Sequence, residues 1–183
     1  MIIEFSVLTH FVLYLKEALL FTTVAAGFSL AILQTGGALG KPISGYISDH
    51  LFHGSRKIVY FFMCCVAVAM SLTFAFLQPN SPLWIITLLS SILGFVAIGI
   101  GGVHLTMVGE IASKELAGTV TGISTAILQI GTVVGPPSFG YIVDTTDSYQ
   151  VGWQLLAVSA AVAAILLLFV REEKGKPTDS PLE

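Results

Sequence analysis

The sequence predicts an all-α, polytopic membrane protein whose six transmembrane helices form two related units of three. Three observations predict this class. Of the 183 residues, 55% are hydrophobic and 10% are charged, and the mean hydropathy is +0.89, whereas soluble domains carry roughly 25% charged residues. The apolar residues fall into six stretches, and two of these stretches are similar in sequence. This composition excludes a soluble enzyme, a nucleic-acid-binding domain and a disordered chain.

Six helices are expected, at residues 2–15, 23–48, 58–77, 83–108, 119–143 and 152–170. A transmembrane helix needs about 20 apolar residues, so the first stretch is too short to span by itself, as if the chain began part-way into a longer helix. The third stretch contains no charged residue. We expect one six-helix domain over 1–171, built from units at about 1–77 and 83–170, followed by a flexible polar tail at 172–183.

Basic residues predict the orientation of these helices. Six of the eight Lys and Arg side chains lie in the segments after the second and fourth helices or in the tail: Arg56, Lys57, Lys114, Arg171, Lys174 and Lys176. Lys16 lies at the opposite end, and Lys41 lies within a helix. Because basic segments stay on the cytoplasmic side, both termini are expected to be cytoplasmic.

An internal repeat links the second and fifth helices. Residues 27–49 (GFSLAILQTGGALGKPISGYISD) and 122–144 (GISTAILQIGTVVGPPSFGYIVD) are identical at 13 of 23 positions at an offset of 95. The matches include a glutamine, spaced glycines, a proline and a final aspartate, whereas shared apolar composition alone would match mainly Leu, Ile and Ala. Three spans separate the copies, so they are expected to cross the membrane in opposite senses. Such an inverted three-plus-three repeat is typical of secondary transporters.

Small residues and prolines recur in both copies of the repeat. Glycines let helices approach closely in lipid, and prolines interrupt backbone hydrogen bonding and favour kinks. Either helices that rock against their neighbours or a static bundle would account for them. The residues concerned are Gly36, Gly40, Pro42 and Gly45 in the first copy, and Gly131, Gly135, Pro136, Pro137 and Gly140 in the second.

The segment between the second and third helices, GYISDHLFHGSRK at residues 45–57, carries a known pattern. It resembles the signature loop of the major facilitator superfamily, G-x-x-x-D-[RK]-x-G-[RK]-[RK]. The matching residues are Gly45, Asp49, Gly54, Arg56 and Lys57. His50 stands where a basic residue is usual, and two extra residues precede the glycine. The run at 131–144 is similar to the eleventh helix of many bacterial members.

The resemblance implies that these helices are helices seven to twelve of a twelve-helix secondary transporter in a bacterial inner (plasma) membrane. Such a transporter moves a small solute by alternating access, and it holds the solute between two halves. The partner is then an N-terminal six-helix half, on the same longer chain or on a separate one. Asp49 would lie against a neighbouring helix end, and Arg56 or Lys57 would join a cytoplasmic charge cluster that breaks when that side opens. No cofactor or metal is implied.

Four polar side chains inside the helices are candidates to line the solute path. Gln34 and Gln129 each precede the aspartate of their repeat by 15 residues, or about 22 Å of helix, near the membrane midplane. Lys41 could attract an anion or extend toward the interface, and His10 could bind solute or a proton because imidazole titrates near neutrality. Hydrogen bonding between helices is the alternative role for His10 and both glutamines. We expect no carboxylate at mid-membrane depth.

Other functions fit the sequence less well. An intramembrane serine protease would need Gly-x-Ser-Gly and a histidine on a later helix, but Pro42 stands at the first glycine position before Ser44 and Gly45, and no histidine follows His104. A channel would show a repeated polar pore face. We therefore expect no enzyme, and a transport-inactive half or a membrane scaffold stays open as the alternative to a transporter half.

Overall fold

The computed structural model describes residues 1–52, 55–79, 81–112 and 115–170. Within these ranges the chain forms six helices and no strand: α1 (Ile2–Glu17), α2 (Thr23–Leu51), α3 (Arg56–Ala75), α4 (Leu83–Ile111), α5 (Ala117–Thr146) and α6 (Tyr149–Phe169). The predicted all-α class and the six helices are confirmed. The five helices α2 to α6 are long and apolar enough to cross a membrane. The predicted tail at 172–183, Gly54 and Lys114 lie outside the described residues.

Several helices extend further than the apolar stretches that predicted them. α2 continues through Asp49 to Leu51, and α3 begins at Arg56 after Ser55, which has an extended backbone. The expectation that the third helix lacks charge was therefore wrong, because its first turn carries Arg56 and Lys57. Helical hydrogen bonding continues past the apolar stretch into the polar interface, where hydropathy no longer marks the boundary.

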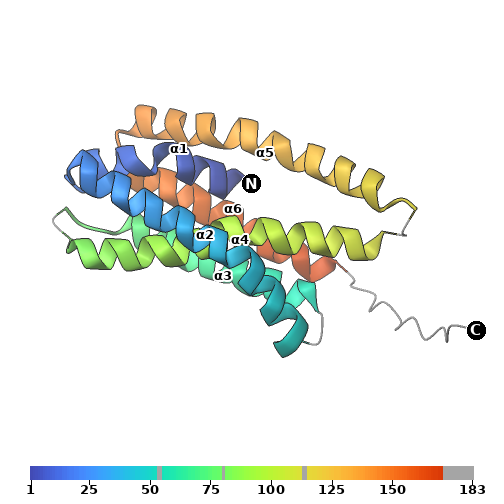
Figure 1. Cartoon of the computed structure of the whole chain (residues 1–183). Coiled ribbons are helices and arrows are strands. Elements are labelled where there is room, and N and C mark those ends of the chain that lie inside the picture. The colour runs from blue at the N-terminus through green and yellow to red at the C-terminus, as the bar shows by residue number, and fades with distance from the viewer. Residues whose placement is uncertain (53–54, 80, 113–114, 171–183) are drawn as a thin grey trace, which may run out of the picture.

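Consecutive helices alternate in direction, and α1 lies between α2 and α5 (Figure 1). We call the end at which α2 and α4 terminate the Asp49 end, and the end at which α5 terminates the Asp144 end. Because α2 and α5 run in opposite directions, these two aspartates of the repeat lie at opposite ends of the bundle. The N-terminus lies about midway along the bundle rather than at either end (Figure 1).

Aromatic side chains form the core near the Asp144 end. Phe74 of α3 stacks on Trp153 of α6 with ring centroids 4.9 Å apart, and the Tyr14 hydroxyl donates to the Phe74 carbonyl oxygen at 2.6 Å. Phe11 of α1 and Phe139 of α5 are fully buried in the same cluster. Each aromatic pair stabilises the cluster by about 0.5–1.5 kcal/mol beyond its buried area. This core holds α1, α3, α5 and α6 together at one end.

Glycines set the close approach of α2 to α4, which form the most extensive helix pair. Gly36 and Gly40 face the backbone of α4, where an added Cβ would lie 2.4 Å from the carbonyl oxygens of Ser91 and Phe95 respectively. From the other side, a Cβ on Gly94 would lie 1.8 Å from the Leu33 carbonyl oxygen. The two backbones therefore touch at positions where a side chain has no room.

The glycines of the second copy make the corresponding contact. Gly131 and Gly135 of α5 face α1, where an added Cβ would lie 3.0 Å from Ile2 Cγ1 and from Ser6 Oγ respectively. Each repeated helix thus packs its glycines against the first helix of the other three-helix unit. The four-residue spacing of Ile2 and Ser6 on α1 equals the spacing of the contacted residues on α4.

Candidate functional site: a charge cluster and polar residues at mid-depth

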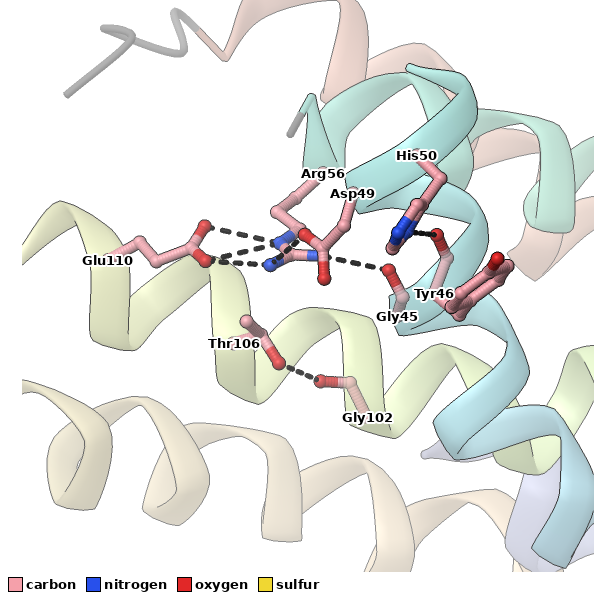
Figure 2. Close-up of polar contacts among 8 residues, drawn as sticks. All are labelled: Gly45, Tyr46, Asp49, His50, Arg56, Gly102, Thr106 and Glu110. Atoms are coloured by element: carbon pink, nitrogen blue, oxygen red, sulfur yellow. Dashed lines mark hydrogen bonds and ion pairs between the residues drawn. The ribbon is translucent and has the colours of Figure 1, made fainter. Parts of the chain in front are cut away.

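Arg56 of α3 contacts acceptors from two other helices, α2 and α4, at the Asp49 end (Figure 2). Its Nη2 lies 2.7 Å from Asp49 Oδ1 on α2 and 2.8 Å from Glu110 Oε1 on α4. Its Nε lies 3.2 Å from each Glu110 carboxylate oxygen, and its Nη1 donates to the Gly45 carbonyl oxygen at 3.2 Å. One guanidinium therefore connects the ends of α2 and α4 to the start of α3.

Helix electrostatics explain why these charges are placed together. A cation at a helix N-terminus and an anion at a helix C-terminus are each unfavourable to the helix dipole. Arg56 is the first residue of α3, and Asp49 and Glu110 lie in the last turn of α2 and α4. Pairing the opposite charges offsets the unfavourable positions of all three.

The two sides of the cluster differ in exposure. The Arg56 side chain is 9% exposed, whereas those of Asp49 and Glu110 are 51% and 50% exposed. Half-exposed carboxylates regain hydration when an ion pair separates, so such pairs contribute little net stability, about 0–1 kcal/mol. A cluster of this kind can break and form again at small cost.

Sequence reasoning brought together only part of this cluster. The structure brings Gly45, Asp49 and Arg56 together, whereas the resemblance implied only that Asp49 lies against a helix end and that Arg56 or Lys57 joins a charge cluster. Glu110 is not among the candidate residues named from the sequence. Lys57 instead reaches the end of α6, where its Nζ lies 3.0 Å from the Leu168 carbonyl oxygen and 2.5 Å from that of Val170. A lysine at this position suits the unpaired carbonyls of a helix C-terminus.

His50, the residue that departs from the family pattern, lies outside the Arg56 contacts. Its ring stacks on Tyr46 with centroids 4.1 Å apart, and its Nδ1 lies 3.2 Å from the Tyr46 carbonyl oxygen. Figure 2 shows the two rings side by side on α2, away from the guanidinium. Histidine in place of the usual Lys or Arg at position 50 therefore leaves the contacts of Arg56 with Asp49 and Glu110 intact.

His10 connects α1 to the proline segment of α5. Its Nε2 lies 3.0 Å from the Pro136 carbonyl oxygen, so Nε2 carries the hydrogen of this bond. Its ring lies 5.0 Å from that of Phe139, and Gly140 leaves room for it, since an added Cβ would lie 3.2 Å from His10 Cε1. Pro137 follows within the same helix. In this arrangement the imidazole joins two helices.

The remaining candidates lie on exposed faces of α2 and α5. Gln34 and Lys41 are exposed on α2 and are seven residues apart, which places them on one side of the helix. The stem of Lys41 lies against α4, with its Cβ 3.3 Å from where a Cβ on Gly102 would be. Gln129 is exposed on α5. The structure does not bring the two glutamines together, because α2 and α5 make no contact and α1 separates them (Figure 1).

One carboxylate, that of Glu4, lies away from both ends of the bundle. Because α1 begins midway along the bundle, its first turn lies far from both ends, and this turn carries Glu4 (Figure 1). The Glu4 side chain is partly buried. Hydropathy alone does not show how far Glu4 lies from the ends of the bundle. Its position follows only from the packing of α1.

Comparison with known proteins gives one consistent family. The model of the Major Facilitator Superfamily matches residues 1–183. The chain is 28% identical over 168 residues to the probable galactarate/D-glucarate transporter of Escherichia coli (strain K12), covering 88% of this chain and 36% of that protein.

Two further relatives are named as transporters of other solutes. The chain is 32% identical over 145 residues to the probable nitrate/nitrite transporter of Mycobacterium tuberculosis (strain ATCC 25618 / H37Rv), covering 78% of this chain and 35% of that protein. It is 28% identical over 148 residues to monocarboxylate transporter 7 of Homo sapiens, and the match covers 80% of this chain and 28% of that protein. The chain thus spans about a third of the length of these relatives.

Proposed function

Because this chain belongs to the major facilitator superfamily, we propose that it forms one six-helix half of a secondary transporter that moves a small anionic solute by alternating access. The chain is an integral membrane protein, as its apolar helices and its relatives indicate. The observation that carries the proposal is the family match over the whole chain together with relatives named as transporters.

An inverted repeat supplies the symmetry that alternating access needs. The units at about 1–77 and 83–170 would be related by a two-fold axis in the membrane plane, so that the half can open to either face with little difference in energy. Two features support this: α2 and α5 run in opposite directions, and the glycines of each pack on the first helix of the other unit.

The Arg56 cluster would close the cytoplasmic side. In this proposal the Asp49 end is cytoplasmic, as the distribution of Lys and Arg indicates, and the membrane is the bacterial inner membrane. The expectation that both termini are cytoplasmic is kept for the C-terminus alone, because the first residue of this chain lies about midway along the bundle. The contacts of Arg56 with Asp49, Glu110 and the Gly45 carbonyl would hold α2, α3 and α4 together while the outer side is open. They would separate when the cytoplasmic side opens.

The solute would lie against the exposed polar face of this half. Lys41 supplies a cation within the membrane, where a charge is costly and usually functional, and Gln34 lies two turns away on the same side. Gln129 and His10 would contribute from α5 and α1. Galactarate, D-glucarate, nitrate and nitrite, which appear in the names of relatives, are anions, and this supports an anionic solute.

A second six-helix unit would complete the solute cavity, because the relatives are more than twice as long as the chain. The competing function is that of a transport-inactive half or a membrane scaffold. It is the second candidate because this chain spans only about a third of the length of its relatives. Both functions predict the same fold, so only a transport measurement separates them.

Uptake into proteoliposomes tests the proposed function. The complete gene product and the 183-residue chain are reconstituted separately and supplied with radiolabelled D-glucarate, lactate and nitrate, with glucose as the neutral control. We expect the complete product to take up at least one anion and no glucose. Replacing Lys41 with Gln should weaken that uptake about tenfold or more, because a hydrogen bond to a charged group contributes about 1.5–3 kcal/mol.

Two results would contradict this function. Uptake of none of the three anions by the complete product would reject anion transport and favour the scaffold. Unchanged uptake in the Lys41→Gln variant would show that Lys41 does not contact the solute. Lys16→Gln, a change of the same kind at an exposed helix end, is the matched control.

A further inference from the structure

Three threonines in the first part of α5 (residues 117–134) keep their hydroxyl groups free. A threonine inside a helix commonly donates to the carbonyl oxygen four residues earlier. The threonines that do so here are Thr9, Thr35, Thr73, Thr87, Thr106, Thr145 and Thr146. Thr121, Thr125 and Thr132 also have such a carbonyl within α5, yet their hydroxyls form no hydrogen bond in the part of the chain that the structure describes. The Thr132 Oγ1 is even shielded from solvent.

These hydroxyls lie on one side of α5, and exposed apolar side chains lie on the opposite side. Successive residues of a helix are rotated by about 100°, so Thr121, Thr125, Gln129 and Thr132 fall within an arc of about 80°, which we call the threonine side. A second arc of about 80°, centred about 180° away, contains Val120, Ile123, Ile127, Ile130 and Val134, all of them exposed. Val133 lies between the two arcs. This part of α5 is therefore amphipathic, and only its apolar side suits lipid.

Contacts of α5 with its neighbours fix the direction of the threonine side. Ser124 Oγ hydrogen-bonds to His104 Nε2 of α4 at 2.8 Å, so Ser124 faces the bundle. On one flank, Ile127 and Ile130 line an apolar groove of about 460 Å³, to which α3 and α6 also contribute. The threonine side lies on the other flank, away from α6. None of residues 117–134 is buried, so this flank is open in the chain.

The threonine side lies at the depth of Lys41. An added Cβ on Gly102 of α4 would lie 3.3 Å from Lys41 Cβ, and one on the adjacent Gly101 would lie 3.6 Å from Met1 Cε. The start of α1 in turn lies against α5 at the residue before Thr132. Lys41 and Thr132 are therefore at similar levels, on either side of α1, which lies between α2 and α5 (Figure 1).

The chemistry of the threonine side differs from that of Lys41. Its hydroxyl and amide groups are neutral, and each can both donate and accept a hydrogen bond. α5 carries no Lys, Arg, Asp or Glu between Ala117 and Val143. Such groups match alcohol hydroxyls, which also donate and accept, whereas an ionised carboxylate or a nitrate ion only accepts. This row of groups therefore suits the uncharged polar part of a solute.

We propose that the threonine side binds the hydroxyl groups of a hydroxylated carboxylate, whose negative group is bound by Lys41. This inference rests on the proposed function and deepens it, because it names the class of the anion. Thr125, Gln129 and Thr132 lie within about 10 Å along the helix, so one six-carbon solute can contact more than one of them. Thr121 lies one turn closer to the Asp49 end and would meet the solute as it leaves on that side.

Uptake of two matched dianions by the complete gene product tests the proposal. D-Glucarate and adipate share a six-carbon chain with a carboxylate at each end, but only D-glucarate carries hydroxyl groups. We expect kcat/KM to be about tenfold or more higher for D-glucarate. Thr125→Val keeps the shape of the side chain and removes its hydroxyl, so it should lower this preference about fivefold, because a hydrogen bond is lost with D-glucarate alone. Thr125→Ser should retain the preference.

Thr119→Val is the matched control, because Thr119 is exposed on the same helix but lies about 120° from the centre of the threonine side. It should leave the preference unchanged. A second measurement needs no transport. In a cysteine-free background of the complete gene product, Thr125→Cys should react with a charged methanethiosulfonate about tenfold faster than Ile127→Cys on the apolar side, and D-glucarate should slow the reaction.

Four results would overturn the proposal: equal transport of the two dianions, an unchanged preference in Thr125→Val, an equal loss in Thr119→Val, or a Thr125→Cys that reacts no faster than Ile127→Cys. The last is the result expected if lipid or another helix covers the threonine side. Uptake of neither dianion would also overturn it. The proposed function fails separately, because uptake of nitrate would still support anion transport after any of these results.

Discussion

Replacing Asp49 with Asn should abolish solute uptake by the complete gene product while leaving folding and membrane insertion intact. Asn has the shape of Asp but carries no charge, so the Arg56 guanidinium loses its 2.7 Å ion pair with α2 and keeps its contacts with Glu110. The closed cytoplasmic side would then lack the ion pair between α2 and α3 and keep the weaker contact of Arg56 with the Gly45 carbonyl oxygen. We expect uptake to fall below a tenth of the wild-type rate.

The same substitution should cost little stability. The Asp49 side chain is 51% exposed, and exposed ion pairs contribute about 0–1 kcal/mol. Thermal unfolding in detergent should therefore differ little between the variant and the wild type, which separates a defect in gating from a defect in folding.

Asp144→Asn is the matched control, because Asp144 occupies the same position of the repeat at the other end and forms no ion pair within the described residues. We expect this variant to retain most of its uptake. Normal uptake by Asp49→Asn, or an equal loss in both variants, would contradict a gating role for the Arg56 cluster.

Among the Gly→Ala substitutions in this bundle, Gly94→Ala should be the most destabilising. The new Cβ would lie 1.8 Å from the Leu33 carbonyl oxygen, a backbone atom that cannot move without separating α2 from α4. Overpacking of this kind typically costs about 1–3 kcal/mol, occasionally more. This loss must exceed the gain of about 1 kcal/mol that Ala brings over Gly in a helix.

Gly27→Ala on α2 provides the control, since nothing lies within 4 Å of its added Cβ. It should leave stability unchanged or raise it slightly through helix propensity. The free energy of unfolding is measured in lipid bicelles for both variants. If Gly94→Ala is as stable as Gly27→Ala, the close contact of α2 with α4 is not as the structure places it.

Much of the fold could be predicted from the sequence because its signals are local. Apolar stretches identified six helices, and the offset of 95 residues identified the glycines at which helices approach closely. Gly94 was missed because its partner, the Leu33 carbonyl, is a backbone atom on another helix. A contact with a backbone atom leaves no pattern of side chains in the sequence from which it could be predicted.

The candidate site was predicted less completely, since its contacts join distant segments. Glu110 meets Arg56 across 54 residues of sequence. Arg56 and Lys57 are adjacent in sequence, yet on a helix they point about 100° apart, so one joins α2 and α4 while the other reaches α6. The position of Glu4 away from both ends of the bundle follows only from where α1 lies in the structure.

Opposite orientation of the two three-helix units is tested most directly by labelling Tyr46 and Tyr141, which are 60% and 70% exposed. Each is replaced by Cys in a background carrying Cys64→Ser and Cys65→Ser, and intact cells are treated with a maleimide that does not cross membranes. We expect Tyr141→Cys to be labelled from outside and Tyr46→Cys to be labelled only after the cells are opened. Labelling of both positions from the same side would contradict the opposite orientation.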